Sequence, residues 1–206
     1  MTRSALRQVL LAPAAMLFAA ALFLGAAFPP PAPVAGGGEL LIASPSIGDP
    51  RFYHAVILMV RHDSKGAFGI VINHPIGMRS LAGLIKAAGG KAQGVSGKVR
   101  VFDGGPVEPQ FGFVLHTSDY HGAGTIAIDS QVALTASRAI LSDIGHNTGP
   151  KKSIIAFGYA GWAPGQLEGE IARHAWFTTP ENPGLVFDHP RSTLWRAAMA
   201  RRTLTL

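Results

Sequence analysis

The residues that could do chemistry in this chain are eight histidines and two glutamates, Glu168 and Glu170, which lie in a glycine-rich segment. His116 and His121 are five residues apart, but residues 117–120 between them resemble a loop, which would not align two imidazoles. A zinc site also needs a third ligand and second-shell acceptors. The chain has no cysteine, which excludes thiolate ligands, disulfides and cysteine nucleophiles. We therefore predict no metal site.

The two glutamates open a short helix predicted over residues 167–173, where Pro164 starts the turn and the positive helix end favours carboxylates. Residues i and i+2 point to different faces of a helix, so the pair is not expected to share one substrate. One interpretation is a binding edge lined by Trp162, Gln166 and Glu168. The other is a structural corner, in which the glycines of residues 158–165 let the chain fold around the indole.

The common catalytic and cofactor signatures are absent from the sequence. There is no Gly-x-Ser-x-Gly elbow for a hydrolase nucleophile, no phosphate-binding loop of the Walker A type, and no Gly-x-Gly-x-x-Gly after a strand. We predict no cofactor, and the catalytic residues, if there are any, are unknown.

Two further segments combine residue types that favour special backbone geometry. Asn73-His74-Pro75 ends a hydrophobic run, and the Asn73 amide can turn onto the backbone. Gly104-Gly105-Pro106 places two glycines before a rigid proline, which permits a positive φ and the close approach of another backbone or a ligand. Each segment is either a structural turn or part of a binding groove.

The elements that must position these residues are mostly strands. Val/Ile/Leu-rich runs predict strands, and residues 54–61 and 67–72 are expected to form an antiparallel hairpin. The predicted strands are residues 39–43, 54–61, 67–72, 99–102, 111–116, 125–128 and 153–157. The predicted helices are residues 80–88 with Ser80 as N-cap, a helix opening at Thr135, residues 167–173 and residues 193–202. This pattern favours an α+β fold with a mainly antiparallel sheet.

The positive charge lies at the two ends of the chain. Between Glu39 and Pro190 there are twelve basic and twelve acidic residues, and the net +6 comes from Arg3, Arg7 and the four arginines after Pro190. A DNA-binding domain concentrates cations on one face. We therefore do not expect nucleic acid as a partner of the domain.

Residues 1–35 are expected to be a signal peptide or membrane anchor with a proline-rich linker, and residues 36–206 a single domain. Two arginines precede a run of about 20 apolar or small residues, which is the order of a secretory signal or of a transmembrane helix. Cleavage fits best after Gly25-Ala26-Ala27. We expect export to the periplasm or anchoring in the inner membrane. The alternative is that the start codon is misassigned and that the real protein is cytoplasmic and begins near Val34.

The motifs of the domain resemble, in order, those of the bacterial YqgE/AlgH family over about residues 39–190. They are Leu41-Ile42-Ala43-Ser44-Pro45, Asp49-Pro50-x-Phe52, Gly66-Ala67-x-Gly69, Asn73-His74-Pro75, Gly104-Gly105-Pro106-Val107, Phe113-Val114-Leu115-His116 and the block from Gly158 to Glu170. The resemblance implies an α+β fold with a bifurcated sheet folded into a pseudo-barrel, flanked by a few helices. It implies no established activity and no agreed catalytic residues, although a role in transcriptional regulation has been proposed for the AlgH branch.

This chain departs from the family in two ways. It carries about 38 extra N-terminal residues, and His74 stands where the family more often has Arg or Lys. An exported protein could not regulate transcription by contacting DNA.

We expect a non-enzymatic domain that binds a protein or a small ligand, or has a regulatory role. The candidate groove residues are Asn73, Pro75, Gly104, Gly105, Pro106, His116, Trp162, Gln166 and Glu168. One alternative is an unrecognised hydrolase with Glu168 or His116 as base. Another, for a cytosolic protein, is a transcription-linked regulator that acts through the tail from Arg196 to Arg202. The membrane is a partner only if the N-terminal segment stays uncleaved.

Overall fold

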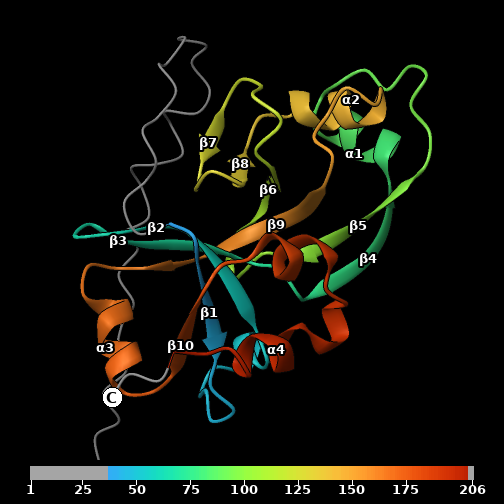
Figure 1. Ribbon diagram of the computed structural model, residues 1–206. Helices are drawn as coiled ribbons and strands as arrows, with labels where there is room; N and C mark the ends of the chain where they lie inside the picture. The colour runs from blue at the N-terminus through green and yellow to red at the C-terminus, as the bar shows by residue number, and fades with distance from the viewer. Residues whose placement is uncertain (1–36, 204–206) are drawn as a thin grey trace, which may run out of the picture.

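The computed structural model describes residues 37–203 of the chain (Figure 1). The expected signal or anchor segment, residues 1–35, lies outside the described residues. Within residues 37–203, no helix has the length and apolar character that crossing a membrane requires.

One half of the sheet is an antiparallel run in the order β10-β1-β2-β3. The strands are β1 (Glu39–Ala43), β2 (Val56–Asp63), β3 (Gly66–Val71) and β10 (Trp176–Pro180). The expected hairpin is confirmed, with Asp63 opposite Gly66. Strand β10 was not predicted from the sequence.

The other half contains the remaining strands. They are β4 (Pro75–Ser80), β5 (Lys98–Asp103), β6 (Val107–Thr117), β7 (Thr125–Ala127), β8 (Val132–Thr135) and β9 (Ser153–Trp162). All their pairings are antiparallel except that of β5 with β9. Thr135 ends β8, so the prediction that it opens a helix was wrong; the helix begins four residues later.

Strand β9 joins the two halves and makes the sheet bifurcated. Its first part pairs with β5 and β6, and residues Ala160–Trp162 pair with β3 (Figure 1). The sequence prediction ended this strand at Phe157 because glycines follow. The strand instead continues through Gly158, whose φ of +74° turns the chain from one half into the other.

Within the described residues, four short helices and two single turns cover the sheet. They are η2 (Pro50–Phe52), α1 (Leu81–Ala87), α2 (Ala139–Gly145), α3 (Gln166–Ala172), the π-helical turn η3 (Gly184–Asp188) and α4 (Arg191–Met199). Ser80 caps α1 as predicted, because its hydroxyl accepts the Gly83 N–H at 3.2 Å.

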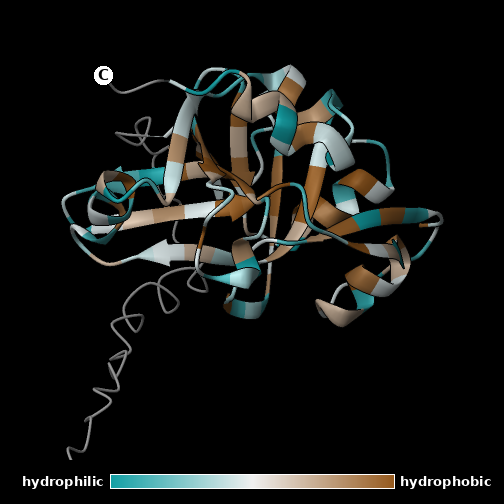
Figure 2. Ribbon diagram, turned by 90° about the horizontal axis from the view of Figure 1, so that it is seen from below, coloured by the Kyte–Doolittle hydropathy of each residue, from teal (hydrophilic) through white to brown (hydrophobic). Residues whose placement is uncertain are grey.

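Hydrophobic clusters cover both faces of the first half of the sheet, and a further cluster joins β5, β6 and β9 to α2 in the other half. In β1, Leu40 and Ile42 face one hydrophobic cluster and Leu41 and Ala43 face another. This double burial explains the uninterrupted apolar runs of β1 and β2. Helix α4 closes the first cluster through its buried residues, and α3 packs Leu167 into the second. Hydrophobic residues are accordingly concentrated in the central strands (Figure 2). The α+β prediction is confirmed.

Candidate functional site

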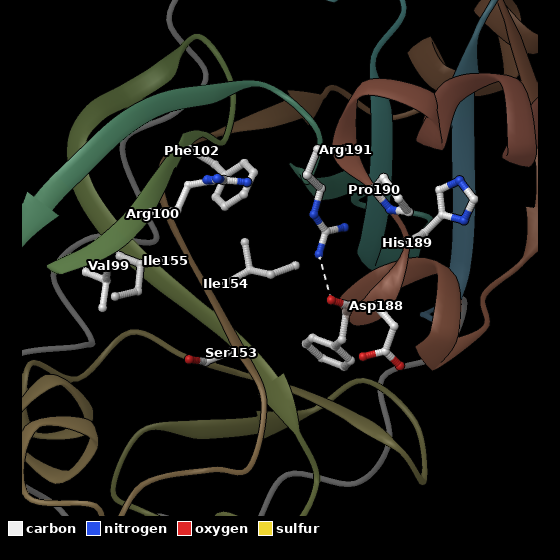
Figure 3. Close-up of a pocket in the computed structure, with 11 residues that line it drawn as sticks. Val99, Arg100, Phe102, Ser153, Ile154, Ile155, Asp188, His189, Pro190 and Arg191 are labelled. Carbon is white, nitrogen blue, oxygen red and sulfur yellow. Dashed lines mark hydrogen bonds between the residues drawn. The ribbon is translucent and has the colours of Figure 1, made fainter.

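A cavity of ≈ 470 Å³ opens where β5, the start of β9, η3 and the start of α4 meet (Figure 3). Its polar lining residues are Arg100, Ser153, Asp188, His189 and Arg191. The apolar lining residues are Val99, Phe102, Ile154, Ile155, Phe187 and Pro190. The volume falls in the range of sites for small molecules, which is roughly 300–1,000 Å³.

Arg191 is the first residue of α4 and is held in place by uncharged groups. Its guanidinium donates to the backbone carbonyls of Leu185 at 3.5 Å and Phe187 at 3.2 Å. None of the four ion pairs formed within residues 37–203 involves Arg191. A guanidinium has five N–H donors. Donors therefore remain on Arg191 for a molecule in the cavity.

A second cation faces the same cavity from β5. Arg100 is exposed, and it makes no hydrogen bond or ion pair within the described part of the chain. Burial lowers the pKa of Arg191, and the nearby charge of Arg100 acts in the same direction, while Asp188 opposes it. Two like charges beside one cavity are more stable when an anion lies between them.

The aspartate of this cavity is already paired. Both carboxylate oxygens of Asp188 accept from Nζ of Lys152 at 2.7 Å. Its charge is therefore shared with a lysine, and the lining remains net positive.

Arg191 also lines a second cavity of ≈ 320 Å³. The other lining residues are His54, Asn73, His74, Ser192, Trp195 and Arg196, and no carboxylate is among them. Two cationic cavities thus have one arginine in common.

Asn73, one of the predicted groove residues, lines the second cavity, but its side-chain amide is hydrogen-bonded to the protein backbone. It is 9% exposed; its Oδ1 accepts the Val56 N–H at 2.8 Å, and its Nδ2 donates to the His54 carbonyl at 2.8 Å. The amide was expected to turn onto the backbone that follows Asn73, but it bonds instead to His54 and to Val56 at the start of β2. Pro75 begins β4 opposite Phe102.

The Gly104-Gly105-Pro106 segment lies beside Asn73-His74-Pro75 and against β9. The Asp103 N–H donates to the His74 carbonyl at 2.8 Å, and the Gly104 N–H donates to the Phe157 carbonyl at 2.7 Å. A Cβ at Gly105, whose φ is +140°, would collide with the backbone of Tyr159. The close approach predicted from the glycines is therefore that of another strand.

His116 lies in the core and is 0% exposed. Its Nδ1 is hydrogen-bonded to the Thr117 carbonyl at 2.8 Å and its Nε2 to Oγ1 of Thr135 at 2.9 Å. Burial lowers the pKa of His116. Both ring nitrogens are used inside the protein, so this geometry gives no support to His116 as a catalytic base.

The glycine-rich segment places Glu170, rather than Glu168, at its centre. The Glu170 carboxylate accepts from Nε1 of Trp162 at 2.9 Å, from Nε1 of Trp176 at 2.8 Å and from Nε2 of Gln166 at 2.9 Å. Glu168 is exposed and contacts Nε2 of His62 at 2.9 Å. The two glutamates point to different faces, as their spacing predicted. Trp162 and Gln166 belong to this cluster, which supports the structural corner.

The nine predicted residues are therefore not gathered at one cavity. Asn73 is the only one of them that lines either cavity described above. Sequence reasoning missed Arg100 and Arg191. The available signal was that Arg191 begins a C-terminal run of four arginines without an acid. Within residues 37–203, no group of three His, Asp or Glu side chains is placed to hold a metal ion.

The chain matches a family model described as AlgH-like over residues 40–206. Similar curated sequences include the UPF0301 protein of Sphingopyxis alaskensis, which is 45% identical over 163 residues covering 79% of this chain and 87% of the relative. The UPF0301 protein of Novosphingobium aromaticivorans is 44% identical over 165 residues, covering 80% and 88%.

Two solved structures share the fold. The solution structure of the AlgH protein from Pseudomonas aeruginosa is 38% identical and covers 80% of this chain and 87% of its own, with a TM-score of 0.69. A crystal structure of a Corynebacterium diphtheriae protein is 22% identical and covers 86% and 92%, with a TM-score of 0.64, which bears on the fold alone. These matches confirm the resemblance predicted from the motifs.

Proposed function

We propose that this chain, which belongs to the AlgH-like family, is a non-enzymatic binding domain that takes a small anion between Arg100 and Arg191. The observation that carries the proposal concerns Arg191: this residue lines two cavities, and no carboxylate in the described part of the chain pairs with its guanidinium.

The chemistry of the site suits an anion with several oxygen acceptors. The planar guanidinium fork matches phosphate and carboxylate groups, and its hydrogen bonds to them are charge-assisted. Ser153 adds a hydroxyl to the lining, and the Lys152–Asp188 pair leaves little negative charge to repel the ligand. A phosphate-sized group therefore has donors on two sides of the cavity.

The alternatives find less support in the same geometry. Neither Glu168 nor His116, the bases of the hydrolase alternative, lines either cavity described here. In the basic tail, the guanidinium of Arg202 lies 5.6 Å from the ring centroid of Phe177 and donates to the Met199 carbonyl at 2.9 Å. These contacts hold that arginine against the domain rather than extending it toward DNA.

Isothermal titration of the full-length protein with inorganic phosphate, sulfate, citrate and acetate tests the proposal. We expect binding of at least one multivalent anion, weakened roughly tenfold or more by Arg191→Gln. Arg100→Gln alters an exposed residue and should weaken binding without changing the melting temperature. Arg173→Gln, an exposed arginine after α3, serves as the control and should bind normally. Turnover of ester or phosphoester substrates, lost in Glu168→Gln, would contradict a non-enzymatic role.

A further inference from the structure

The second cavity has an aromatic wall. The rings of Tyr53 and His54 are stacked with centroids 4.0 Å apart, and those of His54 and Trp195 with centroids 4.1 Å apart. His54 and Trp195 line the cavity, and Tyr53 is 60% exposed at the outer end of the stack. Aromatic rings that line a cavity are suited to packing against another aromatic ring, face to face with an offset or edge to face.

The wall is rigidly positioned. The indole N–H of Trp195 donates to the Ala43 carbonyl at 2.8 Å, which anchors the ring to β1. His54 has a φ of +53°, a conformation that is uncommon for a residue other than glycine. Asn73 holds this backbone by its hydrogen bond to the His54 carbonyl. Strained residues that the surroundings hold in place cluster at ligand sites.

Several polar groups of the residues that line this cavity have donors or acceptors that make no hydrogen bond within residues 37–203. The ring nitrogens of His54 and the hydroxyl of Ser192 make no hydrogen bond within residues 37–203. Asn73 makes one bond through each end of its amide, which leaves one lone pair and one N–H. The cavity can therefore offer both donors and acceptors to a heterocycle.

We propose that the ligand is a mononucleotide, whose phosphate binds between Arg100 and Arg191 and whose base lies in the second cavity against His54 and Trp195. This inference rests on the proposed function, because Arg191 supplies the phosphate contact. The inference adds an aromatic ring to the anionic ligand of the proposed function. Arg191 lines both cavities and so joins the cationic cavity to the one with an aromatic wall. A single molecule carrying both groups uses both cavities.

Titration of the full-length protein with AMP, GMP, CMP and UMP tests this inference, with inorganic phosphate and adenosine as references. At least one nucleotide should bind roughly tenfold or more tightly than phosphate. His54→Gly removes the ring while fitting the positive φ. It should abolish this advantage and leave phosphate affinity within about twofold. His174→Gly, at an exposed residue with φ +57°, is the matched control and should bind like the wild type.

The outcomes separate the two proposals. If phosphate binds and no nucleotide binds more tightly, the nucleotide inference is overturned and the anion site stands. If neither binds, both fail. A single-stranded oligonucleotide could also bind more tightly than any mononucleotide, with an affinity that falls steeply with salt. That result would identify the ligand as a nucleic acid and would also overturn the inference.

Discussion

The guanidinium carbon of Arg191 lies 5.7 Å from the centroid of the Phe102 ring. This contact joins the first residue of α4 to β5 across the cavity, and it is of a type worth about 0.5–2 kcal/mol. Together with the carbonyls of Leu185 and Phe187, it fixes the position of a charge that no carboxylate of residues 37–203 pairs with. The binding proposal depends on this arrangement.

Glu170 should be far more important for stability than Glu168. Glu170→Ala leaves two buried indole N–H groups without an acceptor, and we expect it to lower the free energy of unfolding by about 2–4 kcal/mol. Glu168→Ala removes one exposed pair with His62 and should leave the free energy of unfolding almost unchanged. Urea unfolding followed by tryptophan fluorescence measures both. Equal losses would contradict the role assigned to Glu170.

Gly105 should tolerate no side chain. Gly105→Ala places a Cβ on the backbone of Tyr159 at a φ of +140°, and we expect a loss of roughly 3–5 kcal/mol in unfolding free energy. Gly165→Ala is the control, because Gly165 also has a positive φ but open space around it. It should lose only about 1 kcal/mol. Thermal unfolding compares the two, and similar melting temperatures would refute the close crossing of β9 as the reason for this glycine.

Glu181 should make stability depend on pH. Burial, followed by the neighbouring Asp129, raises the pKa of Glu181 from 4.5 to about 8. Its Oε2 is buried and without a hydrogen-bond partner in the described part of the chain. A carboxyl whose pKa is raised on folding favours the folded state when protonated, so its contribution is complete below about pH 4.5 and is lost as the pH rises toward 8.

The comparison of Glu181→Gln with the wild type tests this assignment. Between pH 5 and 8 the variant should lose less stability than the wild type in urea unfolding experiments. A slope unchanged by Glu181→Gln would show that Glu181 does not titrate in this range.

Local patterns predicted the parts of the fold that local forces determine. The β2–β3 hairpin follows from two apolar runs and a polar turn, and α1 follows from the cap at Ser80. Strand β9 was cut short because glycines usually end strands. Here Gly158 lies so close to the carbonyl oxygen of Gly105 that a side chain would not fit. This contact joins distant parts of the chain, so the sequence of one segment does not reveal it. Strands β4 and β10 were missed for the related reason that their pairing partners, β5 and β1, lie elsewhere in the chain.

The site could be predicted only in part. Asn73 was identified from the sequence, and it does line a cavity. Its amide, however, is used to hold the backbone at His54 in its positive-φ conformation. Glu168 was preferred over Glu170 because spacing alone cannot tell which glutamate faces the indoles. Arg191 was counted as part of a basic chain end. Its importance comes from the cavity formed with β5, some 90 positions earlier in the sequence, and no local pattern contains that contact.

Phosphate titration monitored through the backbone amides of the isotope-labelled full-length protein tests the anion site most directly. The account predicts saturable shifts concentrated in residues 99–102, 153–155 and 187–192, which are lost in Arg191→Gln and retained in Arg173→Gln. Saturable shifts elsewhere, or identical shifts in Arg191→Gln, would contradict it.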